Sequence, residues 1–387
     1  MAPPPSEPPL PDDLLEDIFL RLDGGADLAR AAAACTAFRR IACARRFLRR
    51  FLSLHPPPVL GFLNIGDYGG GFLPAGPPHP SAPAARAVVQ AADFTYSFLP
   101  EPTGWLVQDA LRGRVLLSRR KPTTIFEDIV VCDPLHRRYV EIPPIPEHLV
   151  ASMNSSEMKF EPFLAPSEEE EVDELSFRVV CNVMSQYNIV AFIFSSVTGQ
   201  WRGATSFSLL PDRLIRDPRM LVRHHVRNCF CWAHTFANQM LVLDLGEMKF
   251  SVVGLPPRGA PWRWLAIVDA GEAMLGLLVA DDHTLHRYCK PWRNNGVITE
   301  EWFHDKRIPL HEFVGCYWHI VEAAEGYLLM RAEPRGLIHQ SGQTQQGKFF
   351  TMALKTLMVE RLCVLDQTIR RAQPYASFPP PLSLPRI

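Results

Sequence analysis

A strand–turn–strand pattern that recurs along the chain constrains its fold more than any other feature of the sequence. In each copy an apolar strand meets a turn, a second strand carries an aromatic residue, and a proline often follows. The clearest copies are "DIVVCDPLHRRYVEIPP" (128–144), "AFIFSSVTGQWRGATS" (191–206) and "MLVLDLGEMKFSVVGLPP" (240–257), with weaker copies at 284–310 and 352–366. Each copy follows another short apolar run. Short, evenly spaced strands separated by turn residues predict an all-β construction for this part of the chain.

The spacing of the turns distinguishes between all-β architectures. Successive turns lie about 50 to 60 residues apart, near the ~50-residue blade of kelch-type propellers and longer than a WD40 blade. We therefore predict a β-propeller-like interaction domain over residues 86–373, with a pair of β-sandwiches as the alternative. The proline- and glycine-rich segment 56–85 is interpreted as a linker, in which "VLGFLN" (59–64) could form a first strand. The stretch 374–387 is interpreted as a proline-rich tail.

The segment "LPDDLLEDIFLRL" (10–22) predicts a short helix with more apolar surface than one short helix needs. Pro11 fits the start of this helix, and Asp12 or Asp13 is expected to cap it. Its apolar residues form two adjacent rows on the helix surface: Leu14, Ile18 and Leu22, and beside them Leu15 and Phe19. Two adjacent rows make an apolar face wider than a single packing stripe.

Two further helices are expected after the first one, at 27–35 and 36–51. The second helix is mostly alanine, with Leu28 as its one large apolar residue. We interpret 10–55 as one three-helix module behind a disordered lead, 1–9. A module of this size is usually too small to be stable on its own core. It therefore needs a partner surface.

The run "LPDDLLEDIFLRL…DLARAAAACTAFRRIA" resembles the F-box, the short helical module that binds the S-phase kinase-associated adaptor of SCF ubiquitin ligases. The match extends from Leu10 to about Phe51. The resemblance implies that a set of eight residues divides between the core of the module and the adaptor groove. These are Leu10, Pro11, Leu14, Leu15, Ile18, Leu22, Leu28 and Phe38.

The β part is similar to the C-terminal domains of plant F-box proteins, especially the large grass sets, in its architecture and in phrases such as "VVCDP" and "LPP". The expected fold class is α+β and multi-domain, a small three-helix F-box followed by a mainly-β, propeller-like domain. The resemblance implies a non-catalytic, substrate-recognition subunit of an SCF-type E3 ubiquitin ligase. Its partners would be the adaptor, a cullin through that adaptor, and an unknown target protein on the β domain. No cofactor is implied.

Two other functions fit the same sequence. One is an F-box scaffold that does not direct degradation. The other is a propeller enzyme or glycan-binding protein with a helical cap, which would need carboxylates that converge in the propeller mouth. The chain contains no G-x-S-x-G, H-E-x-x-H, P-loop or dinucleotide-binding motif, so the sequence gives little support to catalysis.

Residue types that bind metals gather between positions 224 and 234: His224, His225, Cys229, Cys231 and His234. Zinc sites usually pair cysteines two to four residues apart and histidines three to five apart. Here one residue separates the cysteines on an expected strand, so both face the same side. This spacing favours a buried sheet edge, and we expect no metal site.

Charge gathers in two segments. The run "SEEEEVDEL" (167–175) is expected to be a solvated loop, with the attraction of a basic partner as the alternative. A basic segment is expected to face the acidic adaptor or the acidic first helix; its arginines are Arg39, Arg40, Arg45, Arg46, Arg49 and Arg50. A net charge of −1 gives no indication of nucleic-acid binding. No apolar run reaches the roughly 18 residues of a membrane span. Nine scattered cysteines indicate reduced thiols, in the cytosol or nucleus.

Overall fold

The computed structural model describes part of the chain as two compact units. It covers residues 10–376, with the exception of 56, 66–70, 120–126, 151–158, 167–175, 186–187, 203–204, 209–220, 235–238, 257–263, 282, 293–300, 311–315, 335–346, 366–368 and 370. A helical unit ends at Pro58, and a β unit extends from Val59 to Tyr375. In the described parts of the chain, no helix is long and apolar enough to cross a membrane.

The helical unit contains four described helices: α1 (Asp12–Phe19), α2 (Gly25–Ala34), α3 (Thr36–Ala42) and α4 (Arg45–Leu54). The sequence predicted three helices. The expected third helix is divided because Ala44, between α3 and α4, has an extended backbone. All four helices contribute to one buried cluster: Leu15, Phe19, Leu20, Leu28, Ala32, Ile41, Ala42, Phe47 and Phe51.

The charges at the start of α1 do not cap the helix as the sequence predicted. Pro11 is the N-cap residue, and no side chain caps the helix because Asp12 and Asp13 already lie in its first turn. Asp12 instead accepts hydrogen bonds from the Arg40 guanidinium, at 2.8 and 3.0 Å. Arg50 lies 3.8 Å from Asp17. These two arginines therefore face the acidic first helix, which is one of the two arrangements expected for the basic segment.

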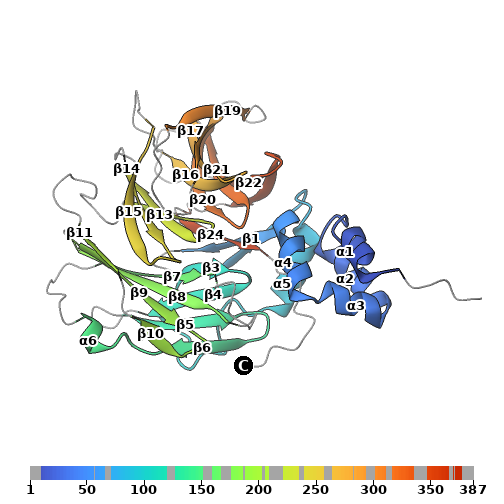
Figure 1. Cartoon of the computed structure of the whole chain (residues 1–387), viewed down its shortest axis with the longest axis horizontal. Helices are drawn as coiled ribbons and strands as arrows, with labels where there is room; N and C mark the ends of the chain where they lie inside the picture. Colours follow the sequence, from blue (N-terminus) through green and yellow to red (C-terminus); the bar gives the residue numbers. More distant parts are fainter. Residues whose placement is uncertain are drawn as a thin grey trace, which may run out of the picture. The chain divides into compact units, whose positions relative to one another are not determined.

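The β unit contains six described sheets arranged around a centre (Figure 1), which confirms the propeller-like fold. Five sheets are blades in which four consecutive strands pair with their neighbours, and they are named here the first to fifth blades in chain order. The first blade contains β3 (Leu106–Leu111), β4 (Arg114–Arg119), β5 (Asp128–Asp133) and β6 (Arg138–Ile142), and the second contains β7 (Lys159–Ala165), β8 (Arg178–Met184), β9 (Asn188–Ser195) and β10 (Gln200–Arg202), with β11 (Ser206–Ser208) also paired to β9. The third blade contains β12 (Leu221–Val226), β13 (Cys229–His234), β14 (Gln239–Asp244) and β15 (Lys249–Gly254), and the fourth contains β16 (Leu265–Gly271), β17 (Met274–Asp281), β18 (Thr284–Pro291) and β19 (Phe303–Pro309). The fifth blade contains β20 (Cys316–Ala324), β21 (Tyr327–Pro334), β22 (Gly347–Ala353) and β23 (Val359–Leu365).

The repeat in the sequence corresponds to the third and fourth strands of these blades. In the first blade the turn after β5 is fixed by Asp133, whose Oδ1 accepts hydrogen bonds from the backbone N–H groups of Leu135 and His136. In the third blade Asp244 Oδ1 does the same for Gly246 and Glu247. Aspartate suits this position because its short side chain can hydrogen-bond to the backbone of the turn that follows it.

Neighbouring blades are joined by buried apolar clusters and by tryptophans. Trp201, in the last strand of the second blade, donates its indole N–H to the Pro143 carbonyl that follows the last strand of the first blade, at 2.7 Å. Trp302, just before β19 of the fourth blade, donates in the same way to the Gly254 carbonyl at the end of the third blade, also at 2.7 Å. The two hydrogen bonds occupy equivalent places. In these two blades a tryptophan therefore connects one blade to the blade before it.

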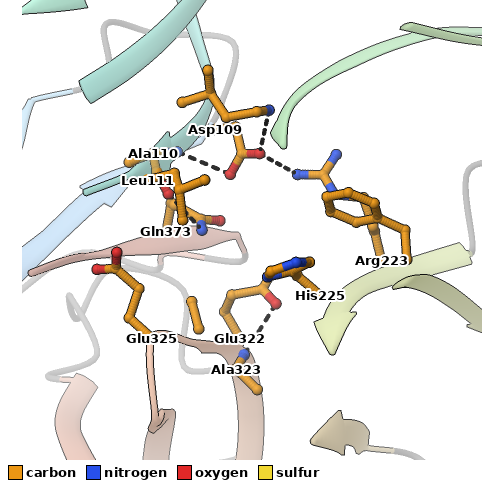
Figure 2. Close-up of a pocket in the computed structure, with 12 residues that line it drawn as sticks. Asp109, Ala110, Leu111, Arg223, His225, Glu322, Ala323, Glu325 and Gln373 are labelled. Carbon is orange, nitrogen blue, oxygen red and sulfur yellow. Dashed lines mark hydrogen bonds and ion pairs between the residues drawn. The ribbon is translucent and has the colours of Figure 1, made fainter. Parts of the chain in front are cut away.

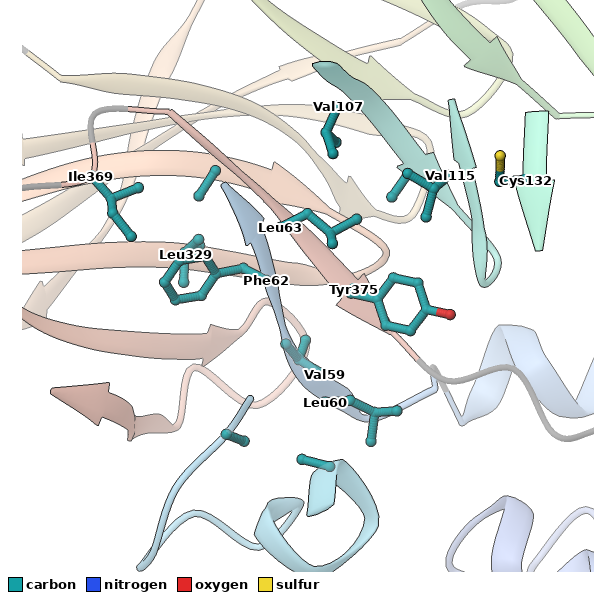
Figure 3. Close-up of a cluster of buried hydrophobic side chains, with 14 of the residues drawn as sticks. Val59, Leu60, Phe62, Leu63, Val107, Val115, Cys132, Leu329, Ile369 and Tyr375 are labelled. Atoms are coloured by element: carbon teal, nitrogen blue, oxygen red, sulfur yellow. The ribbon is translucent and has the colours of Figure 1, made fainter. Parts of the chain in front are cut away.

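The sixth sheet closes the ring with strands from both ends of the unit. It has the order β2 (Phe72–Pro74), β1 (Val59–Asn64) and β24 (Ala372–Ala376), and α5 (Ala82–Ala91) packs against β1 and β2. Figure 3 shows side chains of β1 between those of the fifth blade, such as Leu329, and those of the first blade, such as Val115. The sequence placed the start of the β domain at residue 86 and its end at 373. The structure extends this domain at both ends, because strands in the predicted linker and at the start of the predicted tail form the closing blade. A further short helix, α6 (Glu147–Val150), follows the first blade.

Candidate functional site

At and just before α1, the chain carries apolar side chains that its own unit does not cover. Leu14 and Ile18 of α1 are 51% and 49% exposed and lie at i and i+4, and Leu10, two residues before the helix, is 55% exposed. Leu15 and Phe19, in the adjacent row, are buried in the core of the unit. One row thus holds α1 to the other helices, and the other row remains available for an apolar groove.

The structure divides the eight residues that the sequence predicted for this surface. Leu15 and Leu28 are buried core residues. Leu22 and Phe38 are half-buried and pack against that core. The other four are exposed: Leu10, Pro11, Leu14 and Ile18. The predicted division between core and partner surface is therefore present in the geometry of the unit, while the partner itself stays a prediction.

A second concave site lies in the β unit, where strands from several blades meet. It is a depression with an empty volume of about 420 Å³, part of which is open to solvent. The first strands of the first, second, third and fifth blades line it, together with β24 of the closing blade and Phe230 of β13. Figure 2 shows the charged side chains that face it: Asp109, Arg223, Glu322 and Glu325, with His225 among them. We name this depression the channel pocket.

Arg223 on β12 holds two carboxylates at one side of the channel pocket. Its guanidinium lies 3.1 Å from Asp109 and 3.4 Å from Glu161, and it stacks over the Phe163 ring at 4.4 Å from the ring centroid. Backbone N–H groups of Ala110 and Leu164 also donate to Asp109, each at 2.9 Å. These contacts neutralise Arg223 and fix both acids.

The same two acids differ in the direction of their pKa shifts. Burial raises the pKa of Asp109 above its usual value, against the opposing effect of Arg223. Burial also acts to raise the pKa of Glu161, but the cations Lys159, Arg223 and Arg371 outweigh it and leave that pKa lowered. Trp232 adds a hydrogen bond to Glu161 at 3.2 Å.

Glu322 and Glu325 stand at the other side of the channel pocket without such a partner. Their carboxylates accept backbone hydrogen bonds, Glu322 from Ala323 at 3.0 Å and Glu325 from Arg112 at 2.9 Å. Among the described residues, neither forms an ion pair with a lysine or an arginine within 4 Å. Burial raises the pKa of each glutamate to about 7.

Two histidines of β12 are close to these glutamates and are neutral at neutral pH. The buried ring of His224 lies 3.8 Å from the Glu322 carboxylate, and burial lowers the pKa of His224 to about 3. Burial likewise lowers the pKa of His225, which lines the channel pocket, to about 4. Neither ring nitrogen of His224, nor Nε2 of His225, has a hydrogen-bond partner in the described part of the chain. The histidines therefore do not neutralise the glutamates.

The histidine and cysteine cluster of the sequence belongs to the β12–β13 hairpin. Cys229 and Cys231 lie on one face of β13 and are buried in the apolar cluster between the third and fourth blades. Burial raises the pKa of the Cys229 thiol to about 12. The side chain of His234 and the acidic run 167–175 lie outside the described residues.

Exposed aromatic residues occur near the starts of β16 and β20. Trp264 is 37% exposed, and its ring centroid lies 4.5 Å from that of His319. Tyr317, two residues before His319 on the same face of β20, is 50% exposed. Four other tryptophans of the β unit are buried as blade core: Trp201, Trp232, Trp292 and Trp318. The sequence could not tell which aromatics face solvent, because all of them follow similar apolar runs.

A family model described as "F-box protein AT5G49610-like, beta-propeller" matches residues 106–326, which is more than half of the chain and starts at the first residue of β3. The chain belongs to this family. A second model, F-box-like, matches residues 9–55 and thus the whole described helical unit up to His55. The predicted order, an F-box followed by a propeller, is confirmed. No curated protein matches the chain.

Solved structures resemble the chain only distantly. YCF48 from Cyanidioschyzon merolae is 9% identical with a TM-score of 0.39, over 79% of this chain and 86% of that one. A post-proline cleaving enzyme from Rickettsia typhi is 9% identical with a TM-score of 0.36, over 91% and 57%. Prolyl oligopeptidase B from Galerina marginata is 11% identical with a TM-score of 0.33, over 65% of this chain and only 32% of that one. Similarities at these scores carry no argument about function.

Proposed function

We propose that this F-box protein is the substrate-recognition subunit of an SCF-type ubiquitin ligase, acting in the cytosol or nucleus. The observation that carries the proposal is that Leu10, Leu14 and Ile18 are each about half-exposed, side by side at the start of a module whose Leu15, Phe19 and Leu28 are buried. Large aliphatic side chains, half-exposed at helical spacing, suit a hydrophobic groove on a partner. The adaptor of the ligase is the partner that the F-box match implies, and a cullin would join through it.

The role of the chain in this proposal is to position a target protein. Binding a target on one unit and the adaptor on the other raises the concentration of the target near the transferring enzyme. The chain itself needs no catalytic residue for that role. We propose that the target contacts the exposed aromatic residues Trp264 and Tyr317, since large aromatic side chains dominate many protein interfaces.

The enzyme alternative has one observation in its favour and two against it. Carboxylates do converge in the channel pocket, as a propeller glycosidase would require. However, Arg223 binds Asp109 and Glu161 and fixes them in ion pairs. Glu322 and Glu325 both have a pKa raised to about 7, whereas an acid and a base need environments that separate their pKa values. This arrangement favours binding over acid–base catalysis.

The test of the proposed function is affinity capture of the full-length chain from native tissue, with and without a proteasome inhibitor. We expect the adaptor and a cullin to co-purify, and a target protein to accumulate when the proteasome is inhibited. The variant with Trp264→Ala and Tyr317→Ala should keep the adaptor and lose the target. Phe303→Ala, which removes another half-exposed aromatic from β19, is the matched control and should keep both. Absence of adaptor and cullin from the captured material would contradict the proposal, and a target that never accumulates would indicate a scaffold.

A further inference from the structure

The channel pocket combines a cavity with negative charge that the described residues leave without a contacting cation. Arg223, the arginine that lines it, is already bound to Asp109 and Glu161. Glu322 and Glu325 face the same space from the fifth blade, as Figure 2 shows. The pocket therefore offers two carboxylates to any ligand that enters it.

The groups around each glutamate show how far its carboxylate is compensated when it is ionised. Glu322 faces Arg223 and His224 of β12, Asp109 of β3, and Arg371, which precedes β24. Glu325 faces Arg112 and Asp109. Burial raises the pKa of both glutamates although the arginines act in the opposite direction. The resident cations thus compensate the buried charge only in part.

The ring of His225 is an independent indication of an incomplete site. Buried polar atoms in proteins nearly always have hydrogen-bond partners. Yet, within the described residues, Nε2 of His225 on the wall of the pocket lacks a partner. A ligand that donates a hydrogen bond would satisfy this nitrogen when it is the acceptor of the neutral ring.

The walls of the pocket limit the shape of such a ligand. Leu111, Leu164 and Phe230 supply apolar atoms to the lining, beside the charged groups. A small divalent cation would need more donors, and no group of three or more metal-binding side chains is found among the described residues. An anion would meet two carboxylates that repel it once they are ionised. A long aliphatic stem with a cationic, hydrogen-bond-donating end fits both the apolar wall and the acids.

We propose that the channel pocket binds a lysine or arginine side chain of a protein partner, with the aliphatic stem against Leu111, Leu164 and Phe230 and the cationic end between Glu322 and Glu325. The ligand is thus a basic segment of a protein, inserted at the mouth of the propeller channel. This inference would give the target of the proposed receptor a basic recognition residue. It rests on the proposed function only for that biological meaning, because the binding itself needs no adaptor.

The experiment measures binding of four fluorescent pentapeptides to the full-length chain by fluorescence anisotropy, without adaptor. The peptides have the sequence Gly-Gly-X-Gly-Gly with both ends blocked, where X is lysine, arginine, norleucine or glutamate. We expect the lysine or arginine peptide, or both, to bind at least tenfold more tightly than the norleucine peptide, which has the same stem without the charge. The glutamate peptide should not bind. The difference between lysine and arginine identifies the preferred cation.

Variants and pH distinguish binding in the channel pocket from non-specific electrostatic attraction between the peptide and the acidic residues of the protein surface. Glu322→Gln with Glu325→Gln should weaken binding of the cationic peptide at least tenfold. Glu272→Gln, which removes an exposed acid from the corresponding turn after β16, should leave binding unchanged. Binding should tighten as pH rises from 6 to 8, because the two glutamates must be ionised to hold a cation. Equal binding of the lysine and norleucine peptides, equal effects of the Gln variants and the control, or no binding at millimolar peptide would each overturn the inference. None of these results would bear on adaptor capture.

Discussion

The double substitution Leu14→Asp and Ile18→Asp tests whether the exposed row of α1 is a binding surface. Both side chains are about half-exposed, so docking into a groove can still bury about half of each. Full burial of a leucine or isoleucine side chain contributes about 1.5–3 kcal/mol, so each should contribute about 1 kcal/mol on docking. Truncation of both to alanine should therefore cost about 2 kcal/mol, or roughly a thirtyfold weaker complex. The aspartates should abolish measurable binding, because an unpaired charge in a dry interface costs several kcal/mol more.

The assay is titration of the full-length chain with purified adaptor, accompanied by circular dichroism to monitor folding. The aspartate variant should keep the helical and β signatures of the chain, because neither residue belongs to the buried core. Val89→Asp, on an equally exposed apolar residue of α5 in the β unit, should bind the adaptor normally. Leu15→Ala, in contrast, should destabilise the helical unit by about 2–5 kcal/mol because Leu15 is buried. If the Leu14→Asp, Ile18→Asp chain bound the adaptor as tightly as the unmodified chain, the row would be an ordinary surface and the reasoning would be refuted.

Three further predictions concern the β unit. Replacing Trp201 or Trp302 by Phe removes one indole hydrogen bond between blades, and each change should lower the free energy of unfolding by about 1 kcal/mol. Denaturant titration measures this, and no change in the free energy of unfolding would show that packing of the ring alone holds the blades together. Deleting the acidic run 167–174 should leave the melting temperature within about 5 °C of the original, because like charges stay solvated; a larger fall would contradict this. The pKa values of Glu322 and Glu325 are raised to about 7, so the protonated forms stabilise the fold and this stabilisation should be lost as pH rises from about 4.5 to 7. The loss should be at most about 3 kcal/mol per group. The Gln variants should not show this loss of stability with rising pH.

The sequence predicted the outer strands of the blades better than the inner ones. Turns such as the one at Asp133 and the aromatic residue that follows recur, so the third and fourth strands of each blade could be recognised. The first strands were missed, and several of them carry charged residues that face the channel pocket. Examples are Asp109 in β3, Arg223 in β12 and Glu322 in β20.

The closing blade could not be found by any search for a contiguous repeat. Its strands come from positions separated by nearly the whole β unit, β1 at its start and β24 at its end. Proline and glycine around β1 indicated a linker, although the strand itself fits closely: a Cβ atom on Gly61 would overlap the Leu73 carbonyl of β2. Only the pairing with β24 identifies this segment as part of a blade.

In the helical unit, too, the sequence alone does not show which residues face solvent. Two rows of apolar residues on α1 predicted a surplus of apolar surface, and the structure has that surplus. Which row faces outward depends on how α1 packs against α3 and α4, and both rows are equally apolar in sequence. Leu22, expected in the exposed row, packs against the core instead because α1 ends at Phe19, before it.

Residues of the β unit that recur from blade to blade serve the architecture, whereas residues that occur once can serve binding. Asp133 and Asp244 fix equivalent turns, and Trp201 and Trp302 form equivalent links between blades, so these residues are explained by the ring itself. Asp109 and Glu322 also occupy equivalent positions in β3 and β20, each just after a bulge, but Arg223 does not follow the repeat. Arg223 occurs on one inner strand and meets acids from two others, which are far from it in the sequence. A ring of blades does not require that arrangement, since the fourth blade contributes no residue to the pocket and still packs against its neighbours. Recognition of a partner by the β unit is therefore to be sought where the repeat is broken.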